Sequence, residues 1–310
     1  MSLMRSVFLS LSRSDRLRDT ATRLGPVRKM VRRFIAGETL EEAIAAAEEL
    51  NAQELLATLD HLGENVTSET EARDTTTCVI DLLEAIEASG VQSGVSVKLT
   101  QLGLDLSPAL AAENLQRILA QAAGAQCFVR IDMESSEYVQ RTLDLFEGLW
   151  PRHRNVGVVI QSYLRRSADD VARLVRQGAS VRLVKGAYDE PPDVAFAEKA
   201  ETDASFIQLG EQLFSDEAQA KGVFPAIATH DTRLIEQTKS LTLRRGVSQD
   251  RFEFQMLYGI RPRLQKQLVA EGYRVRVYVP YGQQWFPYLM RRLAERPANL
   301  SFLLRNLLRR

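Results

Sequence analysis

The sequence has little cysteine, little histidine and no excess of charge of one sign. It holds only two cysteines, Cys78 and Cys127, with no C-x-x-C spacing, which argues against a disulfide framework or a thiolate metal cage. The three histidines form no His-x-His pair, so a metal site is not expected. Lysine plus arginine (40) equals aspartate plus glutamate (40), so a strongly basic nucleic-acid-binding protein is not expected either.

Long apolar runs are also missing. No run approaches the roughly 18 residues that span a bilayer, and the N-terminal segment lacks the apolar stretch and cleavage site of a signal peptide. The sequence therefore predicts a cytoplasmic protein. Its 310 residues suit either two domains or one closed α/β barrel of roughly 250 residues.

The two ends of the chain are basic. Residues 5–33 are rich in arginine and have apolar residues at helical spacing, and the tail carries Arg305, Arg309 and Arg310. One interpretation is peripheral docking on an anionic membrane surface, and the other is packing on the protein itself or on another subunit. Residues 38–49 are alanine-rich and acidic, which predicts a helix. We expect a helical leader over 1–50 that packs on a domain over 51–310.

Eight short runs of β-branched and apolar residues recur after residue 54, each followed by a longer segment of helical period. They read as apolar throughout more than alternating, which is typical of strands covered on both faces. The predicted strands lie within 55–64, 94–102, 127–134, 155–163, 179–188, 223–231, 252–259 and 274–282.

Helix start and stop signals separate these runs. Ser68-x-x-Glu71, Ser107-Pro108 and Ser167 are start signals. Six glycines are predicted just past helix ends, at Gly90, Gly124, Gly178, Gly222, Gly246 and Gly272. Strand then helix, eight times, predicts a (β/α)₈ barrel of the TIM type. A doubly wound sheet is the alternative, but no G-x-G-x-x-G follows any strand.

Polar residues end most of the predicted strands, where the active site of such a barrel lies. They are Asp60, His61, Glu64, Lys98, Asp132, Glu134, Gln161, Arg182, Lys185, Thr229, His230, Gln255 and Tyr278. We call this end of the predicted barrel its mouth. Three functions fit the polar residues there: a Schiff-base lyase using Lys98 or Lys185, an enzyme with an anionic organic cofactor such as a flavin, and a non-catalytic scaffold.

The motifs favour the flavin. The segments SVKLTQLG, RIDME, VVIQSYLRR, VRLVKGAY, ATHD, FEFQMLYG, VYVPYG and YLMRRLAERPAN occur in this order between about residues 60 and 302. In sequence and order they resemble the motifs of proline dehydrogenase. The resemblance implies a distorted (β/α)₈ barrel that binds FAD, oxidises L-proline to Δ1-pyrroline-5-carboxylate and passes electrons to a membrane quinone. It also implies the short monofunctional bacterial form.

The resemblance assigns roles residue by residue. It implies that Asp132 and Arg182 act in catalysis, with Asp132 anchoring Lys98 and Arg182 beside the flavin. It implies substrate binding by Lys98, Leu257, Tyr278, Arg291, Arg292 and Glu295, with Tyr281 as a further part of the wall. It implies cofactor binding by Met133, Gln161, Arg182, Val184, Lys185, Gly186, Ala187, Thr229 and His230, with glycine and alanine allowing close approach.

Two further expectations concern the mouth. We expect Glu64 to pair with Arg291 as a gate when proline is bound, because they carry opposite charges. Asp189 stands where the long bifunctional members carry tryptophan, so packing beside the flavin is expected to differ there.

Overall fold

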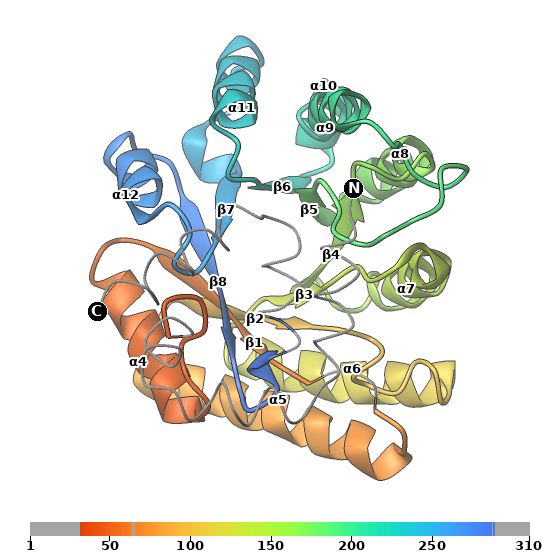
Figure 1. The fold of residues 1–310 in the computed structure, drawn as a ribbon, viewed down its shortest axis with the longest axis vertical. Helices are drawn as coiled ribbons and strands as arrows, with labels where there is room; N and C mark the ends of the chain where they lie inside the picture. Colours follow the sequence, from red (N-terminus) through yellow and green to blue (C-terminus); the bar gives the residue numbers. More distant parts are fainter. Residues whose placement is uncertain (1–31, 64–65, 287, 289–310) are drawn as a thin grey trace, which may run out of the picture.

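The computed structural model describes residues 32–63, 66–286 and 288. Eight parallel strands form a closed barrel in chain order, with the helices arranged around it (Figure 1). The strands are β1 (Leu56–His61), β2 (Ser93–Val97), β3 (Val129–Ile131), β4 (Val156–Gln161), β5 (Ser180–Val184), β6 (Phe224–Ala228), β7 (Glu253–Leu257) and β8 (Val275–Tyr281). Each predicted run overlaps one strand. The barrel is confirmed and the doubly wound sheet is wrong, because β8 pairs with β1 and closes the sheet.

The helices follow the strands. They are α4 (Leu40–Asn51), α5 (Glu69–Ser89), α6 (Pro108–Gly124), α7 (Ser136–Leu149), α8 (Ser167–Gln177), α9 (Lys199–Leu213), α10 (Asp216–Ala220), α11 (Thr232–Arg244) and α12 (Pro262–Ala270), with a 3₁₀ turn at η1 (Gln249–Arg251). The predicted helix over 38–49 is α4, which buries Ala43, Ala46, Ala47 and Leu50 and lies beside β1 and β8. The domain boundary at residue 50 stays a prediction, and the basic segments before residue 32 and after residue 288 lie outside the described residues.

The structure confirms most of the predicted helix ends. Ser68 and Ser107 accept hydrogen bonds from the first turns of α5 and α6, and Gly90 and Gly178 adopt left-handed conformations. Ser167 differs, because it is the first residue of α8 and its Oγ donates to the carbonyl of Gln161 at 2.6 Å. Gly124 differs too, since it ends α6 and the left-handed residue is Gln126.

The inner face of the barrel is polar, which the sequence analysis did not expect. In β8, buried Val275, Val277 and Val279 belong to the apolar core while Arg276 and Tyr278 alternate with them. Most of the other strands alternate in the same way, with apolar residues toward the helices and polar ones inward. In β4 and β6, however, Val159 and Ala226 are level with Arg182 and are apolar. A (β/α)₈ barrel usually fills its interior with bulky branched side chains. This barrel instead carries a polar column from one end to the other.

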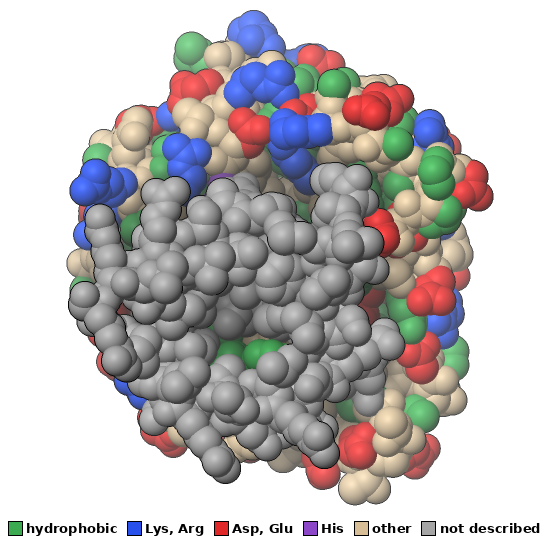
Figure 2. All heavy atoms as spheres, viewed as in Figure 1, with side chains coloured by type: hydrophobic (Ala, Val, Ile, Leu, Met, Phe, Trp, Pro, Cys, Tyr) green, Lys and Arg blue, Asp and Glu red, His purple; other side chains and the backbone are tan. Residues whose placement is uncertain are grey.

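The outer surface mixes the two signs of charge. Figure 2 shows acidic and basic side chains interspersed around the rim of one face, in keeping with the zero formal net charge. Among the helices that the structure describes, none is both long and apolar enough to cross a membrane.

Cys127 provides a first prediction. It is 3% exposed, its Sγ donates to the carbonyl of Ser93 at 3.3 Å, and burial raises the pKa of its thiol to about 11. At pH 8 the thiolate fraction is then about 100-fold lower than in the unfolded chain. We expect iodoacetamide to alkylate Cys127 about 100-fold more slowly in the native protein than in urea, as measured by peptide mass spectrometry. Equal rates in the two states would contradict the buried position.

Candidate active site

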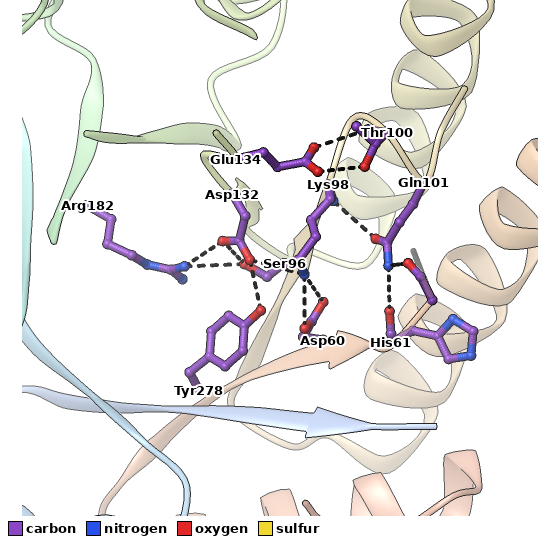
Figure 3. A network of polar contacts seen from close by, with 11 residues as sticks. Asp60, His61, Ser96, Lys98, Thr100, Gln101, Asp132, Glu134, Arg182 and Tyr278 are labelled. Carbon is purple, nitrogen blue, oxygen red and sulfur yellow. Dashed lines mark hydrogen bonds and ion pairs between the residues drawn. The ribbon is translucent and has the colours of Figure 1, made fainter. Parts of the chain in front are cut away.

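Asp132 is the centre of a polar cluster at the C-terminal mouth of the barrel (Figure 3). It follows β3 directly, and its Oδ1 accepts hydrogen bonds from Arg182 Nη1 and Ser96 Oγ, both at 2.8 Å. Its Oδ2 accepts from the Tyr278 hydroxyl at 2.8 Å and lies 3.6 Å from Lys98 Nζ. One carboxylate therefore holds two cations and a phenol, which come from three strands of the barrel, β2, β5 and β8, or from the residue directly after the strand.

Lys98 has a second carboxylate partner that the sequence analysis left without a role. Its Nζ lies 3.2 Å from both carboxylate oxygens of Asp60, which is fully buried in β1. The register brings Asp60 level with Ser96 in β2, two residues before Lys98. A charged residue inside an apolar strand and near the end of it was the available signal. Asp60 thus anchors Lys98 together with Asp132.

The two carboxylates have opposite pKa shifts. Burial alone raises the pKa of Asp132, but Lys98, Arg182 and the hydrogen bonds from Ser96 and Tyr278 lower it below its usual value. Burial raises the pKa of Asp60, and Lys98 offsets this only in part. Burial, followed by Asp132 and Asp60, raises the pKa of the Tyr278 hydroxyl well above its usual value. Tyr278 therefore stays a hydrogen-bond donor at any working pH.

Glu134 and Gln161 form the next layer of the mouth. The Glu134 carboxylate accepts from Thr100 Oγ1 at 2.6 Å and from the Thr100 backbone N–H at 3.2 Å. Gln161, the last residue of β4, donates its Nε2 to the Glu134 carbonyl at 2.9 Å. Met133, between Asp132 and Glu134, is buried. Gln161 is thus hydrogen-bonded to the segment that carries Asp132 and Met133, and the cofactor roles of Gln161 and Met133 stay predictions.

Lys185 lies in an ion-pair cluster after β5. Its Nζ is 2.6 Å from Asp203 Oδ1 in α9 and 3.1 Å from Asp231 Oδ2 after β6. Val184 ends β5 and Ala187 lies in the loop beyond it. Two carboxylates hold Lys185, as two hold Lys98. A Schiff-base lysine needs an amine that is free to attack a carbonyl carbon, whereas two carboxylates contact this Nζ, so the arrangement weighs against the lyase reading.

Gly186 has a packing reason for being glycine. Its φ is +117°, and a Cβ at this position would lie 2.2 Å from the Tyr163 ring. The sequence analysis attributed this glycine to close approach of a cofactor. The described contact is with Tyr163, whose backbone N–H donates to the Lys185 carbonyl at 2.9 Å.

Thr229 and His230 follow β6, and each accepts a hydrogen bond from a nearby backbone N–H. Thr229 Oγ1 accepts from the Asp231 N–H at 3.1 Å. His230 Nε2 accepts from the backbone N–H of Leu257, the last residue of β7, at 2.9 Å. Leu257 is in register with Tyr278 of β8. The predicted cofactor side and the predicted substrate wall are therefore connected through one histidine.

Tyr281 is not part of this wall. It lies an odd number of residues from Tyr278 on β8, so it points to the opposite face of the strand. Its ring packs against His61 with centroids 5.3 Å apart, and it belongs to the apolar core. The expectation for Tyr281 is wrong.

The remaining predicted residues are Glu64, Arg291, Arg292 and Glu295, and they lie outside the described residues. Their roles, including the gate of Glu64 and Arg291, stay predictions. Tyr288, which the sequence analysis missed, is 5% exposed and contributes to the raised pKa of Tyr278. Over residues 32–63, 66–286 and 288, no group of three or more histidine, cysteine or acidic residues has the arrangement of a metal site.

The comparisons with known proteins agree with this architecture. The family profile described as proline dehydrogenase matches residues 43–305. Proline dehydrogenase 1 of Bacillus subtilis strain 168 is 43% identical over 309 residues, covering 99% of this chain and 100% of that protein. Proline dehydrogenase of Deinococcus radiodurans is 41% identical over 285 residues, covering 90% of each chain.

A solved structure is similar in fold. It is proline utilization A of Bdellovibrio bacteriovorus inactivated by N-propargylglycine, with a TM-score of 0.82 and 29% sequence identity. The match covers 89% of this chain but 34% of that chain, so the similarity concerns about a third of the larger protein. The profile match and the near full-length relatives together show that this chain belongs to the proline dehydrogenase family.

Proposed function

We propose that this protein is a monofunctional FAD-dependent enzyme that oxidises L-proline to Δ1-pyrroline-5-carboxylate and passes the electrons to a membrane quinone. The observation that carries the proposal is the cluster of Lys98, Asp132, Arg182 and Tyr278 at the mouth of the barrel, in a chain of this family. The family supplies the reaction class, and the cluster supplies charged and hydrogen-bonding groups for a small zwitterionic substrate.

The residues present fit an anionic flavin. Arg182 is 5% exposed, and its Nε and Nη2 are buried with no hydrogen-bond partner in the part of the chain that the structure describes. Buried guanidinium donors without partners are costly, and an electron-rich ring edge would satisfy them. Gln161 and Met133 lie beside the same cluster. These residues, with Val184 to Ala187, Thr229 and His230, would hold the cofactor.

Bound FAD would supply the acceptor for the hydride that leaves C5 of proline. When proline enters with a neutral amine, its nitrogen lone pair forms the new C=N bond as the hydride leaves, so the first product is the protonated imine. No protein base is then needed at C5, and the chain contributes mainly by orientation. Asp132 fixes Lys98 and Arg182 in place, and Lys98 with Arg291 and Arg292 would hold the substrate carboxylate.

The substrate wall supports selection of a small ring. Leu257 and Tyr278 are level on neighbouring strands, and Tyr278 is held by its hydrogen bond to Asp132. Glu295 and the gate pair Glu64 and Arg291 would complete the pocket. A fixed aromatic and aliphatic wall excludes larger rings better than it excludes one added hydroxyl.

The electron acceptor is proposed from the family resemblance and from the basic leader and tail. A quinone lies in the membrane, and basic residues near an anionic membrane surface contribute about 1 kcal/mol each to docking. Sedimentation with anionic and neutral vesicles tests this step apart from the oxidation itself.

The test of the reaction is an absorption spectrum of the purified protein before and after anaerobic addition of L-proline. We expect a flavin spectrum that L-proline bleaches and that D-proline and glutamate leave unchanged. A flavin that ignores L-proline would overturn the assigned substrate. A protein without flavin, purified from a flavin-replete host, would overturn the assigned cofactor and return attention to the scaffold reading.

A further inference from the structure

A cavity of about 340 Å³ lies at the N-terminal end of the barrel, opposite the candidate active site. Ser180, Phe224 and Glu253 line it, and each is the first residue of its strand. Active sites of (β/α)₈ barrels lie at the other end, where the strands finish. The proposed proline oxidation therefore leaves this cavity without a function.

The cavity has more positive than negative side chains. Its charged lining consists of Arg130, Arg154, Arg182, Arg274, Arg276 and Glu253. Arg182 is paired with Asp132 in the catalytic mouth, and Arg276 is paired with Glu253 at 2.9 Å. Among the described residues, no carboxylate lies within 4.0 Å of the other three arginines.

Arg130 carries the argument. It is 3% exposed, and its Nη1 and Nη2 donate only to neutral oxygens, the carbonyls of Val158 and Ser180 and the Ser180 hydroxyl, at 2.9 to 3.1 Å. Its Nε is buried and has no partner within the described part of the chain. A guanidinium does not lose its proton in proteins, so Arg130 is a buried charge with one unused donor and no described carboxylate within 4.0 Å. Glu253 and Asp132 act on its charge only from beyond that distance.

The rim of the cavity adds two exposed arginines held over aromatic rings. Arg154 lies 4.4 Å from the centroid of the Trp150 ring, and Arg274 lies 5.8 Å from that of Phe224. Stacking limits the freedom of both guanidiniums, so less entropy is lost when they bind a ligand. A shallower depression of about 490 Å³ shares Arg154 with the cavity and is also lined by Arg152. A positive surface thus extends from outside the barrel to Arg130.

We propose that this cavity is a second ligand site, which binds a small oxyanion, a phosphate or a carboxylate, between Arg130 and the rim pair Arg154 and Arg274. Guanidinium groups bind such ions with short charge-assisted hydrogen bonds. Glu253 is the one carboxylate among the described lining residues. It is paired with Arg276 and also acts on Arg130, so the five lining arginines still leave the cavity with an excess of positive charge. The site is separate from the proline site, since Arg182 lies between them and donates to Asp132 on the catalytic side.

The test uses the flavin-loaded enzyme, so that the proposed site of the FAD diphosphate is already filled. Inorganic phosphate and, separately, malonate are titrated by calorimetry at an ionic strength held constant with sodium chloride. We expect saturable binding that is at least about tenfold weaker in the Arg154→Ala/Arg274→Ala variant, because each lost charged hydrogen bond contributes on the order of tenfold. Arg117→Ala, an exposed arginine on α6, is the matched control and should bind like wild type.

Competition between phosphate and malonate shows which kind of oxyanion the cavity accepts. Displacement of phosphate by malonate supports a general oxyanion site, and binding of only one of them supports that chemistry alone. Arg130→Gln should abolish binding, with its fold checked by circular dichroism. Equal affinity in wild type, the rim double variant and Arg130→Gln would overturn the proposal. Turnover of proline by the rim variant should stay within about twofold of wild type, because neither residue lies at the catalytic mouth.

Discussion

Replacing Asp132 by asparagine should lower kcat/KM for L-proline about 100-fold, because a displacement of about 1 Å at the reacting groups costs that much. Asparagine keeps the size of the side chain but removes the charge that holds Lys98 and Arg182 together. The two cations then face each other without a shared partner in the buried mouth. Steady-state assays with a soluble dye as acceptor measure the change without involving the quinone.

The same variant should also lower the free energy of unfolding, by about 3 kcal/mol, since it leaves the buried Arg182 without its carboxylate partner, whereas Lys98 keeps Asp60. The folded pKa of Asp132 is lowered, so its contribution to stability is present above the unfolded pKa of about 3.9 and is lost as the pH falls through the folded value. The stability difference between wild type and Asp132→Asn should therefore be constant between about pH 5 and pH 8 and should shrink below about pH 4.

Asp105 offers a close control. Its carboxylate accepts from the Tyr138 hydroxyl at 2.9 Å and lies 3.2 Å from Arg141 Nη2, while Arg141 lies over the Tyr138 ring. Asp105, Tyr138 and Arg141 thus repeat at the surface the aspartate, tyrosine and arginine of Asp132, Tyr278 and Arg182. The Asp105 side chain is 48% exposed. Asp105→Asn should leave kcat/KM unchanged and cost less than about 1 kcal/mol. If Asp132→Asn also kept kcat/KM within threefold of wild type, Asp132 would have no role in positioning.

The barrel could be predicted because each strand and helix has its own local signals. Apolar runs, serine caps such as Ser107 and glycines such as Gly178 act within a few residues of the chain, and the sequence displays them directly. The helix start at Ser167 was misplaced for a physical reason. Its hydroxyl donates to the end of β4, a tertiary contact that local patterns do not show.

The polar interior could not be predicted in the same way. Arg276 and Glu253 lie on neighbouring strands and balance each other's charge, which lets both be buried. The alternation is visible in the sequence of β8, but only the closed barrel shows which face is inside. Asp60 was noticed at its strand end, yet its role depends on Lys98, which is 38 residues away. The family resemblance named Lys98 and Asp132 but not this third partner.

Replacing Gly186 by alanine should destabilise the protein by about 4 kcal/mol, from two sources. A φ of +117° costs an alanine about 1–3 kcal/mol, and a Cβ 2.2 Å from the Tyr163 ring forces overpacking that costs a further 1–3 kcal/mol or so. Denaturant unfolding measures the loss. Gly210→Ala in α9 is the control, because no atom lies within 4 Å of a Cβ there, and it should stabilise the protein by about 0.5–1 kcal/mol.

The double variant Gly186→Ala/Tyr163→Ala separates packing from cofactor approach. Without the ring of Tyr163, introducing Gly186→Ala into the Tyr163→Ala protein should cost only the backbone part, about 1–3 kcal/mol. Flavin content, measured as the ratio of visible to ultraviolet absorbance, then decides the role of the glycine. If Gly186 serves only to accommodate Tyr163, the double variant retains as much flavin as Tyr163→Ala alone. If the cofactor itself needs the space, the double variant loses flavin although the clash with the ring is gone, and the glycine has a binding role in addition to its packing role.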